Sequence, residues 1–406
     1  MTMLLVLGVL YYFKVLGFIY GVAFSGGGNL LDASLEGNPV NKFSGILIIM
    51  MSLFCLLYTN SIQKISFWKK TSLMWIIPLF CFLSIFWSVE PSYTLKRSIA
   101  LFALFLFSLH LTHFYKEIDL LYFLGCTISA CAVAGLVIGL LAPSLVFLQG
   151  GIRGGAFIGI LADKNAGARL YAIGITILFP YLLQGNRKVL FIIMPIILAL
   201  LLSKSASGVA LCGIGVLTIL YFNLFPFNRN SSNYIGQVLL SLIGYVLLGV
   251  ALYLVKEVVF ILLERDSDLT DRKVIWDIIT PYVEQKHWLG YGFGAFWTSG
   301  SALDFIERWG FIGNAHNGYI ETKLDGGVVF LYLTNGLIFL SMLKSLVYIP
   351  KESRSNECSV SLAIMVIVLV ANSIAHVIPN YYAADFFLLI IVMFLSLSFR
   401  GQESEA

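Results

Sequence analysis

Long apolar runs follow one another along most of this chain, with mainly short polar stretches between them. Several runs reach about 20 residues, the length that an α-helix needs to cross the hydrocarbon core of a bilayer. The runs are too many and too long for the alternating strands of an outer-membrane barrel. The pattern predicts about twelve membrane-spanning helices, at roughly 3–24, 43–60, 72–88, 98–114, 119–148, 166–184, 189–203, 205–225, 234–255, 321–345, 358–378 and 384–399.

Two of these runs are irregular. The run 119–148 is long enough to tilt or to bend near Pro143. The first run carries Lys14 near its middle, which is an unusual position for a charge. Because that run lacks a basic start and is long for the apolar part of a signal peptide, we interpret it as a retained first span.

Composition places the chain in the membrane class. It is 59% hydrophobic and 12% charged, with a mean hydropathy of +0.89. The net charge of +4 is small and scattered, so it does not indicate a nucleic-acid partner. The six cysteines lie in or at the start of apolar runs and form no CxxC pair, so they predict neither a disulfide framework nor a zinc site.

Lysine and arginine between the spans favour a topology with both chain ends in the cytoplasm. If the spans alternate from a cytoplasmic N-terminus, the inner segments carry eleven lysines and arginines. The short outer segments carry seven, including Arg169. The chain then divides into nine first spans (1–255), one large periplasmic segment (256–320), and three last spans with a short cytoplasmic tail (321–406). The predicted protein is therefore an all-α, multi-pass integral membrane protein.

Four outer-face cations lie at, or just beyond, the ends of spans, namely Arg153, Lys164, Lys204 and Arg272. Such groups suit an anionic head group, and an arginine can grip a diphosphate with two parallel hydrogen bonds. In GIRGGAF–ILADKNAG, a helix N-terminus would add its positive dipole end to the first two cations. The alternative is that these side chains only reach lipid phosphates at the membrane surface.

His316 is the candidate catalytic residue of the periplasmic segment. A neutral imidazole can take a proton from a sugar hydroxyl near neutral pH, because its unperturbed pKa is about 6.5. Asn317 either hydrogen-bonds a sugar or caps the following helix. His287, in the run EQKHW, is the competing histidine of the segment, and a purely structural histidine is the other interpretation of His316.

The run GYGFGAFW (Gly290–Trp297) combines three glycines with four aromatic residues. Tyr291 and Trp297 offer apolar ring faces to a sugar, although membrane interfaces are rich in Tyr and Trp in any case. The triplet Asp266-Ser267-Asp268 is a DxD pattern, which holds a metal in many sugar-nucleotide transferases. Here it would lie outside the cell, and Asp268 would equally cap a helix, so no metal site and no cofactor are predicted.

Together these segments resemble the family of O-antigen ligases and the related exopolysaccharide and O-antigen polymerases. The matches run in family order from residue 86 to 327, as FWSVEPSYTLKRS (Phe86–Ser98), GGAF…DKNAGARL, SKSASG (Ser203–Gly208), LTDRKVIW, GYGFGAFW and AHNGYIETKLDGG. The departures are mild. Asp163 stands where a histidine is common in the family, and Asp271 precedes Arg272 where glycine is usual.

The resemblance implies an inverting, metal-independent glycosyltransferase whose donor is an oligosaccharide on undecaprenyl diphosphate. His316 matches the family's catalytic histidine, and Arg153 and Arg272 match positions thought to hold the diphosphate. Lys164 and Lys204 would assist them electrostatically. The predicted substrate-binding residues are Asn317, Tyr319, Tyr291 and Trp297. The implied location is the bacterial inner membrane, with the active site facing the periplasm.

Two questions stay open at this point. A polymerase would add the glycan to another lipid-linked repeat, whereas a ligase would transfer it to lipid A-core, and the motifs WSVEP, DKN and AHNGY favour the polymerase slightly. A rival from another class is a twelve-span transporter or flippase. Such proteins usually place ionisable groups mid-membrane and have two related halves, whereas here one outer segment dominates and Lys14 is nearly the only intramembrane charge.

Overall fold

The structure is a computed structural model that describes residues 2–24, 39–58, 71–114, 120–150, 154–161, 163–224, 236–237, 239–240, 243–244, 269–302, 313–348 and 355–398. Arg153, the DxD triplet and most of the predicted span 234–255 lie outside the described residues, as does the first part of the predicted periplasmic segment. Within the described part the secondary structure is helical, apart from one isolated bridge between Phe147 and Phe157.

The α-helices follow the apolar runs of the sequence. They are α1 (Thr2–Tyr12), α2 (Val15–Phe24), α4 (Pro39–Tyr58), α6 (Ile76–Leu83), α7 (Pro91–Phe114), α8 (Leu120–Leu141), α9 (Pro143–Val146), α10 (Lys164–Leu183), α11 (Val189–Leu202), α12 (Ala206–Leu224), α14 (Leu269–Gln285), α16 (Gly318–Tyr348), α17 (Ser355–Asn372) and α18 (Ala384–Ser398). Short 3₁₀ turns η2 (Ser72–Trp75) and η3 (Ser84–Phe86) flank α6, and η4 (Phe296–Thr298) and η5 (Gly300–Ala302) follow α14. The run 119–148 divides at Pro143, where a bend was predicted.

Five described helices are long and apolar enough to cross a membrane, namely α7, α8, α10, α12 and α16, and the bent pair α1–α2 makes six. Shorter apolar helices stand at several other predicted spans, including α11, α17 and α18. A multi-pass, all-helical protein is therefore confirmed within the described residues. The count of twelve spans and the periplasmic placement of 256–320 stay predictions.

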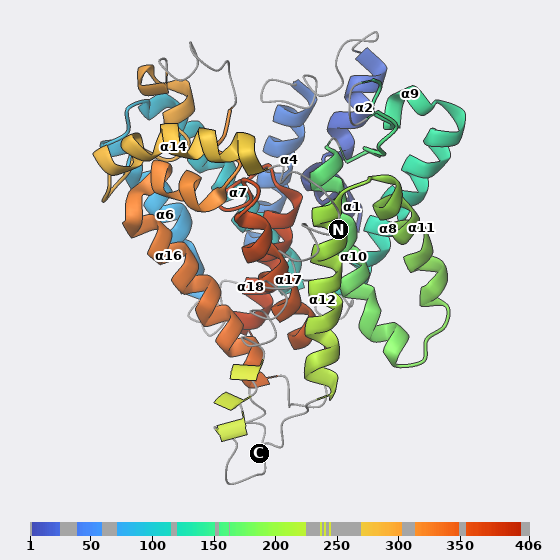
Figure 1. The fold of residues 1–406 in the computed structure, drawn as a ribbon. Helices are drawn as coiled ribbons and strands as arrows, with labels where there is room; N and C mark the ends of the chain where they lie inside the picture. Colours follow the sequence, from blue (N-terminus) through green and yellow to red (C-terminus); the bar gives the residue numbers. More distant parts are fainter. Residues whose placement is uncertain are drawn as a thin grey trace.

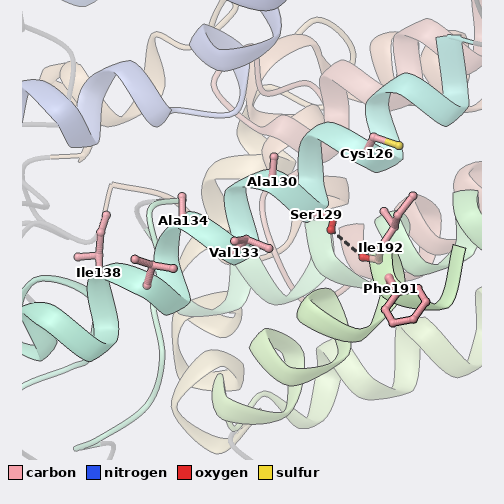
Figure 2. Close-up of a pocket in the computed structure, with 9 residues that line it drawn as sticks. Cys126, Ser129, Ala130, Val133, Ala134, Ile138, Phe191 and Ile192 are labelled. Atoms are coloured by element: carbon pink, nitrogen blue, oxygen red, sulfur yellow. Dashed lines mark hydrogen bonds between the residues drawn. The ribbon is translucent and has the colours of Figure 1, made fainter. Parts of the chain in front are cut away.

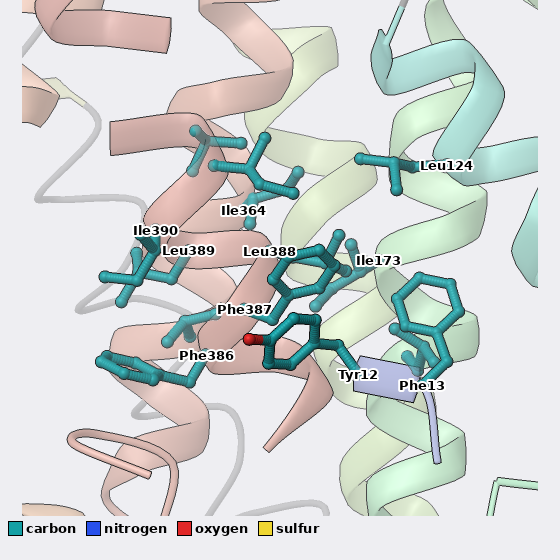
Figure 3. Packing of buried hydrophobic residues seen from close by; sticks show 14 of the residues in the cluster. Tyr12, Phe13, Leu124, Ile173, Ile364, Phe386, Phe387, Leu388, Leu389 and Ile390 are labelled. Atoms are coloured by element: carbon teal, nitrogen blue, oxygen red, sulfur yellow. The ribbon is translucent and has the colours of Figure 1, made fainter. Parts of the chain in front are cut away.

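α18 forms the centre of the bundle. Its residues from Phe386 to Phe394 are all buried, as expected for a helix that is apolar on every side. It packs against α7, α17 and α16, while α10 packs against α8, α11 and α12. Figure 3 shows Tyr12 and Phe13 beside Phe387, and the rings of Tyr12 and Phe387 stack with centroids 4.6 Å apart.

The first predicted span is broken, which corrects the single span expected over 3–24. The axes of α1 and α2 differ by 75°. Between them Lys14 has φ 63°, a left-handed conformation that costs a non-glycine residue of order 1–3 kcal/mol. The charges of Asp163, Asp385 and Arg169 all act on Lys14. The chain thus accommodates this lysine by ending the helix near two carboxylates.

α16 is broken as well, at Gly326 (φ −146°, ψ 18°) and Gly327 (φ 66°, ψ −166°). The loop after α14 bonds to the backbone groups that the break frees. The N–H of Val328 donates to the carbonyl of His287 at 2.9 Å, and the N–H of Tyr291 donates to Leu324 at 2.7 Å. A Cβ on Gly327 would overlap the carbonyl of Trp288, so glycine is required here for close approach as well as for its φ. The predicted span 321–345 is therefore two helical pieces.

Candidate functional site

The candidate site lies where α14 crosses one end of the bundle, close to the start of α16 (Figure 1). We call residues 269–302 and 313–325 the His316 segment. Its small hydrophobic core includes Ile279, Tyr291, Phe296 and Leu324 and is separate from the core of the bundle.

The loop before α16 places His316 in an uncommon conformation. Its φ is 50°, and its backbone N–H donates to Oδ1 of Asn314 at 2.9 Å. The next residue, Asn317, accepts from the backbone N–H of Tyr319 at 3.0 Å and so caps α16. The half-buried imidazole of His316 is thus presented by a short, hydrogen-bonded turn directly before a helix.

α14 connects this turn to a second loop. Nη1 of Arg272 donates to the carbonyl of Ile374 at 2.7 Å, in the loop between α17 and α18. One turn further along the same helix, Nε1 of Trp276 donates to the carbonyl of Ala315 at 2.9 Å. Residues four apart lie on one face of a helix. Arg272 and Trp276, which bonds to the histidine turn, therefore lie on the same face of α14.

Three influences set the protonation of His316. Burial lowers the pKa of the imidazole, the positive charge of Arg272 lowers this pKa further, and the negative charge of Asp163 raises it. The net direction is downward, so the ring is neutral and basic near neutral pH. The charges of one residue in LTDRKVIW and of one in the DKN motif therefore both act on the imidazole of AHNGY.

The cationic loops also come together. Nζ of Lys204 donates to the carbonyl of Gly154 at 3.3 Å, and the hydroxyl of Ser205 donates to Oδ1 of Asn165 at 3.2 Å. Lys164 is the first residue of α10, whose N-terminus is capped by Asp163 through a 2.7 Å bond from the N–H of Ala166. These contacts bring together SKSASG, Gly154 of GIRGGAF and DKNAG, and they place Lys204 in a loop that borders the start of α10, where Lys164 lies.

Residues 189–334 match a family model described as O-antigen ligase. The match supports the O-antigen ligase and polymerase family. The match includes Lys204, Arg272 and His316, and it supports an O-antigen ligase-type membrane enzyme. No curated protein matches the chain.

In the aromatic run GYGFGAFW, both of the rings that were predicted to bind sugar are buried inside the protein. Tyr291 is 2% exposed and Trp297 5% exposed. The hydroxyl of Tyr291 lies 3.0 Å from the carbonyl of Tyr282, and Nε1 of Trp297 lies 3.1 Å from both carboxylate oxygens of Glu321. Sugar binding by these two rings stays a prediction, and this conformation offers a sugar neither ring face.

The segment FWSVEPSYTLKRS packs on the same loop. The N–H of Val89 donates to the carbonyl of Tyr291 at 2.9 Å, and Nη1 of Arg97 donates to the carbonyl of Gly294. Segments about 200 residues apart in the sequence are therefore joined by backbone-directed bonds. Through these bonds this segment supports the loop, and the loop supports the start of α16.

Sequence reasoning missed a second histidine at the site. Burial, the charge of Arg97 and the charge of His316 together lower the pKa of His376 to about 4, against a smaller rise from a backbone hydrogen bond at Pro379. Its Nε2 is buried and has no hydrogen-bond partner within the described residues. No motif marks His376 in the sequence, and the bonds of its loop to Arg272 and to the start of α16 bring it to the site.

Buried charge was also missed. Arg169, expected in an outer segment, lies inside α10, and its Nε forms a 2.5 Å ion pair with Oδ2 of Asp385 at the start of α18. Within the described helices, this pair is therefore a buried charge in addition to the Lys14 that the sequence singles out. An Arg and an Asp at the ends of two apolar runs were the available signal, but their pairing over 216 residues could not be read from spacing.

A groove elsewhere on the bundle differs in character from the site. It has a volume of about 670 Å³, lies between α8 and α11, and is lined by apolar or small residues such as Val133, Ile138 and Phe191. Figure 2 shows the 2.6 Å bond from the hydroxyl of Ser129 to the carbonyl of Ile192 across it. The groove contains none of the cationic or imidazole groups described above, so we do not assign it to the chemistry.

Proposed function

We propose that this protein transfers an oligosaccharide from undecaprenyl diphosphate to a sugar hydroxyl on the periplasmic face of the bacterial inner membrane, and that it polymerises O-antigen or exopolysaccharide repeats. The observation that carries the proposal is the half-buried imidazole of His316, held in a hydrogen-bonded turn within electrostatic reach of Arg272. Attack by a hydroxyl requires a base, and departure of a diphosphate requires a cation such as a guanidinium close to that base.

In the proposed reaction, His316 removes the proton from the acceptor hydroxyl as its oxygen attacks the anomeric carbon. The bond from that carbon to the diphosphate oxygen breaks on the opposite side, so the configuration inverts. The electron pair leaves with the diphosphate, whose charge Arg272 stabilises. The lowered pKa of His316 keeps the ring neutral before it accepts the proton.

The remaining cations are proposed to complete the diphosphate site. The loop of Lys204 borders the start of α10, where Lys164 lies. Arg153 directly precedes Gly154, whose carbonyl accepts from Lys204. Fixed cations can stabilise a leaving diphosphate in the way that a metal does in other transferases. We therefore propose a metal-independent enzyme.

Substrate contacts are proposed for Asn317 and Tyr319. Oδ1 of Asn317 is occupied by the helix cap, which leaves its amide nitrogen to donate to a sugar oxygen. The hydroxyl of Tyr319 donates to the carbonyl of Leu369 at 2.9 Å, so this ring would contribute a wall to the site. The burial of Tyr291 and Trp297 supports a role in holding the segment in place.

The test is reconstitution of the purified protein in proteoliposomes with a lipid-linked repeat unit as donor. Supplying either a second lipid-linked repeat or lipid A-core as acceptor separates the proposed polymerase from the ligase that the family model's description favours. His316→Ala is expected to lower turnover by about 10²–10⁴-fold, the usual contribution of a general base. His287→Ala, a change at an exposed histidine of the same segment, is the matched control and keeps wild-type turnover.

The same pair of variants tests the transporter alternative. If glycan assembly in cells survives His316→Ala at wild-type protein levels, the proposed transfer chemistry is wrong and transport is favoured. If His287→Ala abolishes turnover while His316→Ala does not, the wrong histidine has been assigned.

A further inference from the structure

The peptide group on each side of Ala315 is held by a side chain. The N–H of Ala315 donates to Oε1 of Glu321, and its carbonyl accepts from Nε1 of Trp276 at 2.9 Å. Ala315 itself is fully buried. The residue that directly precedes His316 is therefore fixed from two directions, by a helix on each side.

Glu321 is the centre of this arrangement. Its side chain is 2% exposed, and both carboxylate oxygens lie 3.1 Å from Nε1 of Trp297. A buried carboxyl group is costly unless its oxygens are hydrogen-bonded. Here the carboxyl group accepts from a backbone N–H and an indole N–H, and these bonds fix one turn of backbone.

That turn needs to be fixed. His316 has φ 50°, and a non-glycine residue in the left-handed region persists only where its surroundings impose the conformation. Its own N–H bonds to Asn314 at 2.9 Å, which shapes the turn locally. The contacts of Ala315 supply the constraint from outside the turn.

The same contacts set the position of Arg272 relative to His316. Trp276 and Arg272 lie one turn apart on α14, and Arg272 donates to the carbonyl of Ile374. The next residue, Ala375, accepts from the N–H of Gly318 at 3.0 Å, at the start of α16. The bonds therefore form a closed ring, from α14 through the histidine turn and α16 to the α17–α18 loop and back to α14.

We propose that Glu321 and Trp276 are positioning residues, which hold the histidine turn at a fixed place and orientation relative to Arg272. This inference rests on the proposed function, because it assigns these residues to the geometry of that transfer reaction. Neither residue touches the substrate. Their effect is on how well the base and the leaving-group cation are aligned when the substrate is bound.

The test uses changes that remove one bond at a time. Trp276→Phe keeps an aromatic ring but removes the donor to Ala315, and Glu321→Ala removes the acceptor. Misplacement of a reacting group by about 1 Å can cost about 10²-fold in rate. We expect turnover to fall by about 10-fold to 10²-fold in each variant, with the KM for the lipid-linked donor within about twofold of wild type. Glu321→Gln keeps an oxygen acceptor for Ala315 and is expected to restore part of the turnover that Glu321→Ala loses.

Trp288→Phe is the matched control, because Trp288 is 69% exposed and its side chain takes no part in the ring of bonds. It is expected to keep wild-type turnover and KM. The proposal would be overturned by wild-type turnover in all three variants, Trp276→Phe, Glu321→Ala and Glu321→Gln. A loss of donor affinity with unchanged turnover would overturn it too, because it would place these residues in binding.

Hydrogen exchange of the peptide that contains Ala315 provides a readout that is independent of activity. Its amide is expected to exchange faster in Glu321→Ala and Trp276→Phe than in wild type, because the constraint on the turn is lost. Suppose that the wild-type protein transfers glycan neither to a second lipid-linked repeat nor to lipid A-core, while the exchange of Ala315 is still faster in the variants. The proposed function has then failed, but the two side chains do constrain the turn. If exchange is unchanged in an active protein, the positioning role has failed.

Discussion

In the bundle core, buried side chains mostly meet other apolar side chains, whereas in the His316 segment several aromatic side chains end in polar atoms that bond to a backbone carbonyl or a carboxyl group. Phe386 to Phe394 of α18 illustrate the first case, with an uninterrupted run of buried apolar residues. Tyr291, Trp276 and Trp297 illustrate the second, since each directs a hydroxyl or indole N–H at a defined acceptor.

This difference separates stability from geometry. Apolar burial has no preferred direction and scales with area, so the core can hold helices together without fixing any one atom closely. Hydrogen bonds depend on distance and angle, so the His316 segment can hold an imidazole and a guanidinium at set positions. We infer that the bundle provides most of the stability and the segment most of the geometry.

The largest expected effect concerns the buried ion pair between Arg169 and Asp385, which is an exception in the mostly apolar bundle core. Arg169→Met leaves Asp385 buried without its partner, and removing one member of a buried pair typically costs about 3–5 kcal/mol. We expect the variant to lose thermal stability by this amount, or to fail to accumulate in the membrane. Thermal unfolding of purified protein in detergent is the measurement.

The double variant Arg169→Met with Asp385→Leu is the control, because replacing both members of such a pair by apolar residues is often neutral. Recovery of stability in the double variant would show that the uncompensated charge causes the loss. If the single variant loses less than about 1 kcal/mol, as exposed pairs do, the pair is solvated and the core is less dry than its burial indicates.

A smaller loss is expected where the two regions join, at the break in α16. Gly327→Ala places a Cβ against the carbonyl of Trp288 in a backbone conformation that essentially only glycine adopts. We expect a loss of at least about 2 kcal/mol, together with faster hydrogen exchange in 287–292, whose bonds seal the break. Circular dichroism melting and exchange mass spectrometry measure the two effects.

Gly336→Ala provides the comparison within the same helix. No atom lies within 4 Å of a Cβ at Gly336, and alanine favours a helix over glycine by about 1 kcal/mol. This variant should therefore be neutral or slightly more stable. Equal behaviour of the two alanine variants would mean that the loop does not pack into the break as described.

These two regions also differ in how far the sequence predicts them. Apolar run length predicts the helices of the bundle, since a span of α8 or α10 needs only about 20 apolar residues in a row. Even the division at Pro143 follows from local chemistry, because proline lacks the N–H that continues a helix. The break at Lys14 is different, because the charges near it come from α10 and α18, far along the chain.

In the candidate site, the residues proposed to act in the reaction are easier to predict from the sequence than the residues that hold them in position. Arg272 and His316 stand out as charged or titratable groups in short motifs, and the structure lets the charge of Arg272 act on His316. Trp276 and Glu321 occur in the same motifs, but their bonds to Ala315 depend on how α14 crosses α16. His376 has no local signal, because only tertiary packing brings its loop to Arg272.

The smallest expected effect concerns the protonation of His316, and it has opposite signs for two variants. A base must be deprotonated to act, so activity is expected to fall as the pH drops through the pKa of His316. The positive charge of Arg272 lowers this pKa and the negative charge of Asp163 raises it. Arg272→Gln should therefore move the acid limb of the kcat/KM profile to higher pH, and Asp163→Asn should move it to lower pH.

The midpoint of the acid limb is the readout, because Arg272→Gln also removes a proposed diphosphate contact and will lower the height of the curve. The charge of His316 also acts on His376, whose pKa is lowered to about 4. Asp277→Asn is the matched control for Asp163→Asn, since Asp277 is an exposed carboxylate on α14 and its charge is not among those that act on His316. Midpoints that move in the same direction for Arg272→Gln and Asp163→Asn would show that a group other than His316 titrates. That result would remove the electrostatic link between the cationic loops and the histidine turn.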